Sequence, residues 1–301
     1  MIRVLASDGI AKSAAIKLEE LGYEVVQEFY EADVLAEKVK EYDALVVRSA
    51  TKVRKPIIDS ALETGKLKVV IRGGVGVDNI DVEYARSKGI KVCNTPKSSS
   101  DSVAECTIGH MFAMARFIGI SNYAMRNGEW PKKAYKGIEL AGKTVGLIGM
   151  GRIAQSVAKK ASAIGMKIMY TDIFDIEGLP SEYVKSTKEE ILRNADFVSC
   201  HVPAQDNPVI GKEELALMKK TSYILNLARG GVVDEDALCD ALDNGELAGA
   251  ALDVFVKEPL GNERILKNDK ISITPHIGGS TNEAQDRIGI EIVDILEETF
   301  K

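Results

Sequence analysis

The sequence predicts an α/β protein built from two doubly wound parallel sheets. Short apolar runs alternate with helical patterns from end to end, which is typical of parallel strands covered by helices on both faces. The runs are too numerous for one sheet of this kind, and 301 residues are enough for two hydrophobic cores.

Each expected strand is a short apolar run bounded by glycine, proline or charged residues. In chain order the expected strands are residues 2–6, 44–48, 69–72, 91–93, 144–149, 167–170, 197–201, 223–227, 249–252 and 271–274. The expected helices between them repeat apolar residues at intervals of three and four, for example over 11–21, 34–41, 154–163 and 234–243.

Two longer helical segments determine the expected division into domains. A helix is predicted over 103–127, after Pro96 and a serine and aspartate cluster that supplies an N-cap, and it is the natural crossover between domains. The last segment, 281–301, is an amphipathic helix, and if it packs on the first sheet, the first domain is discontinuous. We therefore predict one domain from 1–95 and 281–301 and another from 96–280.

The composition excludes several classes of protein. With 39 basic and 45 acidic residues the net charge is −6, so the chain repels polyanions on average and we expect no nucleic-acid partner. No run approaches the roughly 20 apolar residues that span a bilayer, and the first residues have the pattern of a strand rather than a signal peptide. The cysteines form no C-x-x-C pair, so we expect buried, reduced thiols in a cytoplasmic protein: Cys93, Cys106, Cys200 and Cys239.

A glycine motif, Gly149-x-Gly151-x-x-Ala154, joins an expected strand to an expected helix. Gly149 permits a tight turn, Gly151 lets the backbone approach a pyrophosphate, and the small Ala154 lets the helix pack close to the sheet. Asp172 ends the next strand about 20 residues further on, where a carboxylate accepts hydrogen bonds from the adenosine ribose and repels a 2′-phosphate. The motif predicts a Rossmann-type domain that binds NAD rather than NADP, although a purely structural turn is the alternative.

A second glycine cluster, Arg72-Gly-Gly-Val-Gly-Val-Asp78, ends a strand in the first half of the chain. It lacks the dinucleotide spacing. Successive N–H groups in such a turn can form a nest for an anion such as a substrate carboxylate. A tight turn without a ligand explains the same residues equally well, so both interpretations stay open.

Only three histidines are available for proton transfer near neutral pH. His110 lies on an apolar helix face and is expected in the core or an interface, and His201 ends a strand and is expected to line a cofactor pocket. His276 lies on a Pro/Gly-rich loop, where an exposed side chain is the alternative. Glu258 follows the preceding strand, so its carboxylate can orient the imidazole of His276 for proton exchange with a hydroxyl or carbonyl oxygen.

Arg229 follows the expected strand 223–227 in the segment Asn226-Leu-Ala-Arg-Gly-Gly. Its planar guanidinium at the carboxyl edge of a sheet suits a substrate carboxylate, whereas a solvated surface arginine is the alternative. Arginine, glutamate and histidine at successive strand ends favour the first interpretation.

Four ordered motifs resemble those of the D-isomer-specific 2-hydroxyacid dehydrogenase family over essentially the whole chain. They are Gly149-x-Gly151-x-x-Ala154, Asn226-x-Ala-Arg229-Gly-Gly, Asp253-Val-Phe-x-x-Glu258-Pro and Pro275-His276-x-Gly-Gly-Ser-Thr. Within the family, the segments that begin at Arg48 and Arg72 are similar to those of the branch that oxidises D-3-phosphoglycerate.

The resemblance implies an NAD domain inserted into a discontinuous, flavodoxin-like substrate-binding domain, with substrate in the cleft between the domains and a homodimer formed through the NAD domains. It implies that Arg229 holds the substrate carboxylate and polarises the carbonyl, that His276 is the acid/base and that Glu258 is its partner. The implied cofactor-binding residues are Val75, Gly149, Gly151, Arg152, Ile153, Asp172, His201, Val202, Pro203, Leu227, Ala228, Asp253, Gly278 and Gly279. The implied substrate-binding residues are Arg48, Arg72, Gly73, Gly74, Ser99 and, from the partner subunit, Lys132. No metal is implied.

We therefore predict NAD-dependent oxidation of D-3-phosphoglycerate to 3-phosphohydroxypyruvate, a step of serine biosynthesis. The alternatives are a glyoxylate or hydroxypyruvate reductase and, from a different class, an NAD-sensing corepressor-type binding protein. The chain departs from the family at Val75, where a cofactor-side threonine is usual, and at Lys132, where an arginine can stand. Because the chain ends at Lys301, we expect no C-terminal serine-binding domain and no serine feedback through it.

Overall fold

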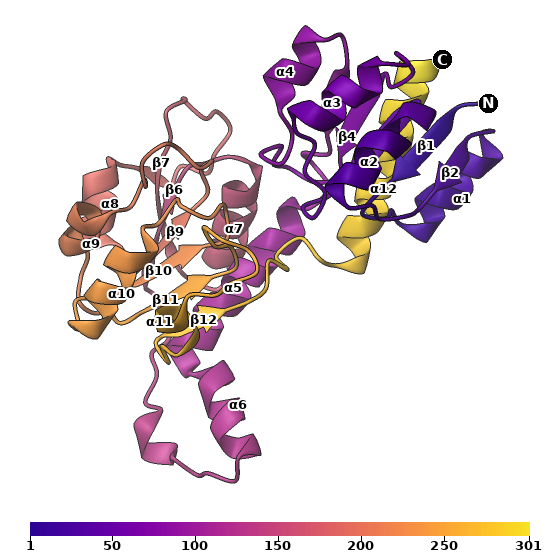
Figure 1. Ribbon diagram of the computed structural model, residues 1–301. Coiled ribbons are helices and arrows are strands. Elements are labelled where there is room, and N and C mark those ends of the chain that lie inside the picture. The colour runs from indigo at the N-terminus through magenta and orange to yellow at the C-terminus, as the bar shows by residue number, and fades with distance from the viewer. The chain divides into compact units, whose positions relative to one another are not determined.

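The computed structural model describes residues 1–301 and divides into two compact units (Figure 1). The first unit comprises Met1–Ser99 and Gly279–Lys301, and the second comprises Ser100–Gly278. The first unit is therefore discontinuous in sequence, because its last helix follows the whole of the second unit.

The first unit is a five-stranded parallel sheet in the order β2-β1-β3-β4-β5, which is the flavodoxin-like order. Its strands are β1 (Arg3–Ala6), β2 (Glu24–Val26), β3 (Ala44–Val47), β4 (Val69–Arg72) and β5 (Lys91–Asn94). Its helices are α1 (Lys12–Glu20), α2 (Ala32–Lys38), the 3-10 turn η1 (Val39–Glu41), α3 (Lys55–Leu62), α4 (Val82–Ser87) and α12 (Asn282–Phe300).

The second unit is a seven-stranded parallel sheet in the order β12-β11-β10-β9-β6-β7-β8, so the strand order reverses between β6 and β9 as in a Rossmann domain. Its strands are β6 (Thr144–Ile148), β7 (Lys167–Thr171), β8 (Val184–Lys185), β9 (Phe197–Cys200), β10 (Tyr223–Asn226), β11 (Gly249–Leu252) and β12 (Ile271–Ile273). Its helices are α5 (Ser100–Arg116), α6 (Ile118–Arg126), η2 (Lys132–Ala134), α7 (Arg152–Ala163), α8 (Lys188–Asn194), α9 (Lys212–Leu217), α10 (Glu235–Asp243) and α11 (Glu263–Leu266).

Each sheet separates two hydrophobic clusters, because successive residues of a strand point to opposite faces. In the second unit, Ile224 of β10 packs in the cluster beneath α8, α9 and α10, and the next residue, Leu225, packs in the cluster beneath α5 and α7. In the first unit, Leu45 and Val46 of β3 divide in the same way between the α2–α4 side and the α1–α12 side. Strands buried on both faces explain why the sequence shows continuous apolar runs.

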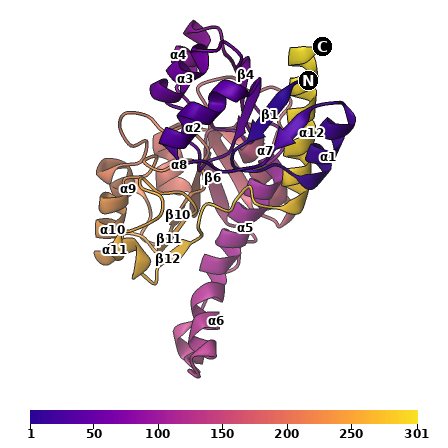
Figure 2. The same cartoon turned by 45° about the vertical axis from the view of Figure 1, so that its right-hand side comes forward.

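The C-terminal helix α12 completes the core of the first unit. Ile288, Ile292 and Leu296 pack with Leu18 of α1 in one cluster. Figures 1 and 2 both show α12 beside α1. The expectation that the last helix returns to the first sheet is therefore confirmed.

The single helix predicted over 103–127 is wrong. The segment forms two helices, α5 and α6, with an angle of 64° between them. Phe117 separates them in a left-handed conformation with φ of 56°, which ends the run of right-handed helical residues. Its ring lies 5.7 Å from that of Tyr135, which returns from beyond α6.

Most predicted strands lie within one residue of their observed bounds, whereas β2 and β8 were not predicted. Both are edge strands of two or three residues without a buried position. Such strands have no apolar run that a sequence pattern can detect. The expectation of buried thiols is also wrong in part: all four cysteines are free, but Cys93 and Cys106 are only half-buried.

None of the helices has, on its own, both the length and the hydropathy needed to cross a membrane. Only the bent pair α5 and α6, taken together, has that length and hydropathy.

Candidate active site

Three neighbouring strands of the second unit carry the predicted catalytic residues at their carboxyl ends. Asn226 of β10 pairs in register with Leu252 of β11, which pairs with Ile273 of β12. Arg229, Glu258 and His276 therefore follow the ends of adjacent strands, at the edge where open parallel sheets bind ligands.

The imidazole of His276 is hydrogen-bonded to Glu258. The distance from Nδ1 to Oε2 is 2.9 Å, and the side chains are 33% and 36% exposed. The other carboxylate oxygen of Glu258 accepts the backbone N–H of Phe255 at 3.1 Å, which fixes the carboxylate. An ionised carboxylate only accepts, so we assign the Nδ1 proton to the histidine, which leaves Nε2 to exchange a proton with a ligand.

The loop that carries His276 is held by the buried carboxylate of Asp253, which is 1% exposed. One oxygen accepts the hydroxyl of Thr274 at 2.6 Å and the N–H of Ile277 at 2.8 Å, and the other accepts the N–H of Gly278 at 2.8 Å. These bonds enclose His276, which has a left-handed backbone with φ of 54°. Asp253 was predicted as a cofactor-binding residue. The structure shows in addition that it supports the loop of His276.

The turn that carries Arg229 is held by the amide of Asn226. That amide donates to Arg229 O at 2.8 Å and accepts from Ala228 N at 3.1 Å, and the guanidinium of Arg229 donates to Ala228 O at 2.6 Å. The next residue, Gly230, lies so close to Phe255 that an added Cβ would be 2.0 Å from its carbonyl oxygen. The turn of Arg229 thus packs directly on the segment that positions Glu258.

The glycine turn after β6 is shaped for an anion. Gly149 has φ of +92°, and an added Cβ there would lie 2.7 Å from His201 O. An added Cβ at Gly151, by contrast, has no neighbour within 4 Å. Gly151 is the N-cap of α7 and no side chain caps that helix, so its first N–H groups remain available to a ligand. This turn fits the pyrophosphate of a dinucleotide.

Asp172 follows β7 and is tied to the same turn. Its carboxylate accepts the N–H of Met150 at 2.6 Å and the N–H of Phe174 at 2.9 Å. Each oxygen keeps a second lone pair, which can accept a ribose hydroxyl. The geometry fits the predicted role of Asp172.

The other predicted cofactor residues of the second unit also gather at the carboxyl edge. Burial lowers the pKa of His201 to about 4, so the ring is neutral at pH 7, and it is hydrogen-bonded to Ser199 Oγ at 2.9 Å. No cluster of three or more His, Cys, Asp or Glu could hold a metal ion. The gathered residues are Arg152 and Ile153 at the start of α7, His201, Val202 and Pro203 after β9, Leu227 and Ala228 after β10, and Gly278 after β12.

The predicted substrate residues Arg48, Arg72, Gly73, Gly74 and Ser99, together with Val75 and Gly279, belong to the first unit. Arg48 and Arg72 lie at the ends of β3 and β4. The guanidinium of Arg72 covers Gly74, since an added Cβ at Gly74 would be 1.4 Å from Nη1. Lys132 is exposed in η2 and belongs to the second unit.

The anion nest predicted in the Arg72–Asp78 turn is only partly available. Gly73 N donates to Val47 O at 2.8 Å, and Gly74 N donates to Arg72 O at 2.9 Å. These two N–H groups cannot also bind an anion, because each serves a backbone carbonyl. The following N–H groups, at 75–77, donate to no protein acceptor.

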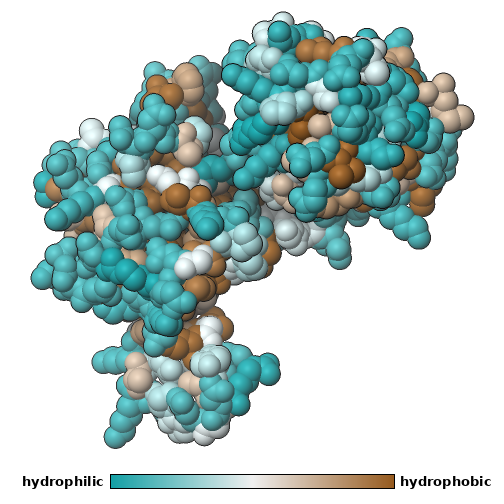
Figure 3. Space-filling model, in the orientation of Figure 1, coloured by the Kyte–Doolittle hydropathy of each residue, from teal (hydrophilic) through white to brown (hydrophobic).

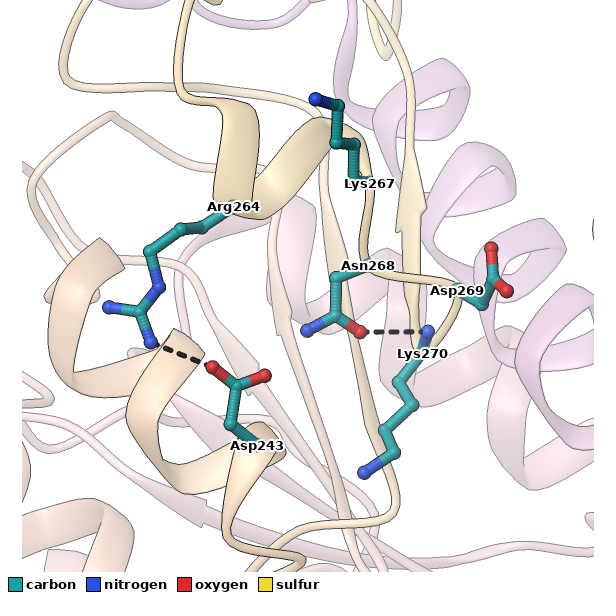
Figure 4. A pocket seen from close by; sticks show the side chains of 6 residues that line it. All are labelled: Asp243, Arg264, Lys267, Asn268, Asp269 and Lys270. Carbon is teal, nitrogen blue, oxygen red and sulfur yellow. Dashed lines mark hydrogen bonds and ion pairs between the residues drawn. The ribbon is translucent and has the colours of Figure 1, made fainter.

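A shallow depression elsewhere in the second unit contains none of the predicted residues (Figure 4). Its charges are largely paired within the protein: Arg264 contacts Asp240 and Asp243 at 2.8 Å each. The depression lies where the chain enters β12, at the amino ends of the strands, so it is not at the ligand-binding edge. Its lining residues are Asp243, Arg264, Lys267, Asn268, Asp269 and Lys270.

The polar contacts beneath the loop of His276 were not predicted from the sequence. His110, expected only as a core or interface residue, is buried and contacts Ser272 and Thr274 with its two ring nitrogens. One signal in the sequence is a polar residue on an otherwise apolar helix face, which when buried needs hydrogen-bond partners.

Comparison with known proteins gives consistent matches to one family. The model of the NAD-binding domain of the D-isomer specific 2-hydroxyacid dehydrogenases matches residues 108–278. D-3-phosphoglycerate dehydrogenase of Methanocaldococcus jannaschii is 44% identical over 100% of this chain and 58% of its own length. Hydroxypyruvate reductase of Thermotoga maritima is 47% identical over 97% of this chain and 96% of its own length.

Among solved structures, the TT0316 protein of Thermus thermophilus superposes with a TM-score of 0.90 and 34% identity, covering 99% of this chain and 97% of that one. The chain thus spans little more than half of the Methanocaldococcus enzyme but nearly all of the Thermotoga enzyme.

Proposed function

The chain belongs to the D-isomer-specific 2-hydroxyacid dehydrogenase family, and from this we propose that it oxidises D-3-phosphoglycerate to 3-phosphohydroxypyruvate with NAD, a step of serine biosynthesis. The observation that carries the proposal is the His276–Glu258 hydrogen bond of 2.9 Å at the carboxyl edge of the sheet that also bears the glycine turn. Such a pair can remove the hydroxyl proton of a 2-hydroxy acid.

In this proposal His276 is the acid/base. A dinucleotide held by the glycine turn and Asp172 would supply the acceptor for the hydride from C2 of the substrate. Neutral His276 takes the hydroxyl proton at Nε2, and the Nδ1 proton stays in the hydrogen bond to Glu258. The carboxylate stabilises the imidazolium that forms, as a fixed charge does in other acid–base pairs.

Arg229 binds the substrate carboxylate and stabilises negative charge on the C2 oxygen. The hydrogen bonds of Asn226 hold its turn in place before the substrate binds. A preorganised donor of this kind typically contributes about 10²–10³ in rate. Replacing Arg229 by Ala is therefore expected to lower kcat/KM by at least about 100-fold.

Hydroxypyruvate is the second candidate substrate. The Thermotoga enzyme, named hydroxypyruvate reductase, matches this chain over almost its whole length.

Arg48 and Arg72 at adjacent strand ends of the first unit favour a second anionic group on the substrate. In the proposal these arginines, with Ser99, recognise the phosphate and carboxylate, while Gly73 and Gly74 only shape the turn beside them.

The cofactor preference for NAD rests on Asp172. Its carboxylate repels the 2′-phosphate of NADP, and its free lone pairs suit the ribose hydroxyls of NAD. The proposal places the reaction in the cytoplasm, where the four free cysteines would stay reduced.

We propose a homodimer formed through the second unit. The segment of α6 and η2 projects from that unit in Figures 1 and 2, and Figure 3 shows hydrophobic residues exposed where it leaves the body. Tyr123 and Trp130 on this segment are 70% and 75% exposed. A second copy of the chain would cover these two side chains. It would also contribute its Lys132 to substrate binding, as the resemblance implies.

The oligomeric state tests this interface. Light scattering during size-exclusion chromatography should give twice the chain mass for the wild type and a monomer for the double variant Tyr123→Ser/Trp130→Ser. Phe29→Ser, which alters an exposed aromatic residue of the first unit, should remain a dimer. A monomeric wild type would contradict the proposal.

A substrate panel tests the proposed reaction. Absorbance at 340 nm would follow D-3-phosphoglycerate and D-lactate with NAD or NADP, and glyoxylate and hydroxypyruvate with NADH. The highest kcat/KM is expected for D-3-phosphoglycerate with NAD. A higher value for hydroxypyruvate would favour the function of a hydroxypyruvate reductase. If no hydroxy acid is turned over and the chain binds a protein partner stoichiometrically, the corepressor-type protein is favoured.

A further inference from the structure

His110 lies in the middle of α5 and is buried, with 5% of its surface exposed. Both of its ring nitrogens are hydrogen-bonded to the neighbouring edge of the sheet. Nδ1 is 2.9 Å from Ser272 Oγ in β12, and Nε2 is 3.0 Å from Thr274 Oγ1 just after β12. A buried histidine needs hydrogen-bond partners, and here both partners belong to the segment that leads into the loop of His276.

The directions of these hydrogen bonds follow from the donors and acceptors available. Thr274 donates its single hydroxyl proton to Asp253 at 2.6 Å, so it can only accept from His110. Nε2 of His110 therefore carries the ring proton. Nδ1 of the neutral ring is then an acceptor and receives the hydroxyl proton of Ser272.

The groups near His110 favour this neutral form. Burial lowers the pKa of His110, and the negative charge of Asp253 opposes that effect. One turn earlier on α5, burial raises the pKa of the Cys106 thiol to about 11, so it is uncharged at pH 7. Asp253 is thus the only nearby charge, and Thr274 stands between it and His110.

The hydrogen bonds that begin at His110 continue through Thr274 and Asp253 to the loop of His276. Asp253 accepts the N–H groups of Ile277 and Gly278, the two residues that follow His276. If the proton of Thr274 turned away, one carboxylate oxygen would lose its shortest hydrogen bond, and its hold on the N–H of Ile277 would change.

We infer that His110 and Thr274 are positioning residues for His276. His110 fixes the hydroxyl of Thr274 toward Asp253, and Asp253 in turn holds the Thr274 side chain before the left-handed residue 276 and the backbone N–H groups of the two residues after it. The imidazole is thereby kept in reach of Glu258. The inference deepens the proposed function, since it assigns the support of the same acid/base.

Amide hydrogen exchange and kinetics test the inference together. Thr274→Val removes the hydroxyl at equal volume, and His110→Leu removes both ring nitrogens. In both variants the amides of Ile277 and Gly278 should exchange about 10-fold faster, and kcat should fall about 10- to 100-fold with a smaller change in KM.

Matched variants separate positioning from general stability. Thr274→Ser keeps the hydroxyl and His110→Gln keeps a donor at the place of Nε2, so both should stay near the wild type. Thr107→Val is the control, because Thr107 is a fully buried residue of the same helix whose hydroxyl bonds only to Val103 O at 2.8 Å. It should leave kcat and the exchange at 277 and 278 unchanged.

The outcomes distinguish the inference from the proposed function. Wild-type exchange in Thr274→Val, or faster exchange with an unchanged kcat, would overturn the inference. If His110→Leu does not fold, the comparison of Thr274→Val with Thr274→Ser tests the inference. If the wild type turns over no hydroxy acid, the proposed function fails, and the exchange rates still decide whether the loop is held in this way.

Discussion

His276 is one of only two residues other than glycine with a positive φ, the other being Phe117. A left-handed conformation costs a non-glycine residue about 1–2 kcal/mol, so the surrounding bonds must impose it. Here the N–H of His276 donates to Thr274 O at 3.0 Å, and Asp253 holds the next two residues. The strain coincides with the proposed acid/base, which is where a precise side-chain direction matters.

At the scale of single residues, the sequence predicted which strand ends the proposed catalytic residues follow, but not which residues support them. Arg229, Glu258 and His276 stand in motifs at strand ends, so their common edge followed from the parallel sheet. The role of Thr274 could not be predicted, because it depends on a contact with His110 that is 164 residues away in the chain. No local pattern encodes such a distant hydrogen bond.

The preference for NAD over NADP is predicted to depend on the carboxylate of Asp172. Asp172→Asn removes its charge and one acceptor, so the ratio of kcat/KM for NADP to that for NAD should rise by at least about 10-fold, since repulsion of the 2′-phosphate is lost. Steady-state kinetics with both cofactors measure this ratio. Asp175→Asn removes an equal charge from the same exposed loop, at a residue that pairs with Lys185. Equal ratios for the two variants would show that Asp172 does not set the preference.

Among the elements, those with a buried apolar run were predicted and those without one were not. β2 and β8 have no buried residue, and the break between α5 and α6 occurs at Phe117, a residue that favours neither a turn nor a helix end. The break follows from tertiary contacts such as the one between the rings of Phe117 and Tyr135. Patterns within a single segment do not contain that information.

The packing of α12 on α1 predicts an unusual response to an added methyl group. Ala is favoured over Gly in a helix by about 1 kcal/mol, but a Cβ at Gly289 would lie 2.7 Å from Ala14 Cβ. Gly289→Ala should therefore lower the free energy of unfolding by about 1–3 kcal/mol in urea titrations.

Gly109→Ala is the matched control for this packing. Gly109 lies in the middle of α5, where an added Cβ has no neighbour within 4 Å. This variant should be as stable as the wild type or more so. If Gly289→Ala is equally stable, α12 does not pack on α1 as closely as described.

At the scale of the whole molecule, the sequence predicted two parallel sheets because strands buried on both faces leave short but uninterrupted apolar runs. The discontinuity of the first unit followed from one amphipathic helix at the end of the chain. The bonding of the turn at Arg72 did not follow from the sequence, since two of its N–H groups donate to the backbone carbonyls of Val47 and Arg72.

The stability of the whole molecule should depend on pH through His201. Its pKa is lowered to about 4 in the folded protein, compared with about 6.5 when unfolded, so the unfolded chain binds the proton first. The stability is therefore full above pH 6.5 and is lost as the pH falls toward 4. Through His201, lowering the pH from 7.5 to 5 should reduce the free energy of unfolding by about 1–2 kcal/mol.

The variant His201→Gln tests this dependence, because glutamine can keep the bond to Ser199 and does not titrate. Urea unfolding of the cofactor-free protein at both pH values should show a smaller loss for the variant than for the wild type. An equal loss would show that His201 does not take up the proton on unfolding. His110, whose pKa is also lowered by burial, contributes in the same direction to both proteins.

The most direct test of the proposed reaction is the rate of NADH formation from D-3-phosphoglycerate by His276→Asn, beside the dissociation constant for NADH. We expect a kcat about 10²- to 10⁴-fold below that of the wild type, because the proton acceptor is gone, with an unchanged affinity for NADH. A kcat close to that of the wild type would show that His276 is not the proton acceptor.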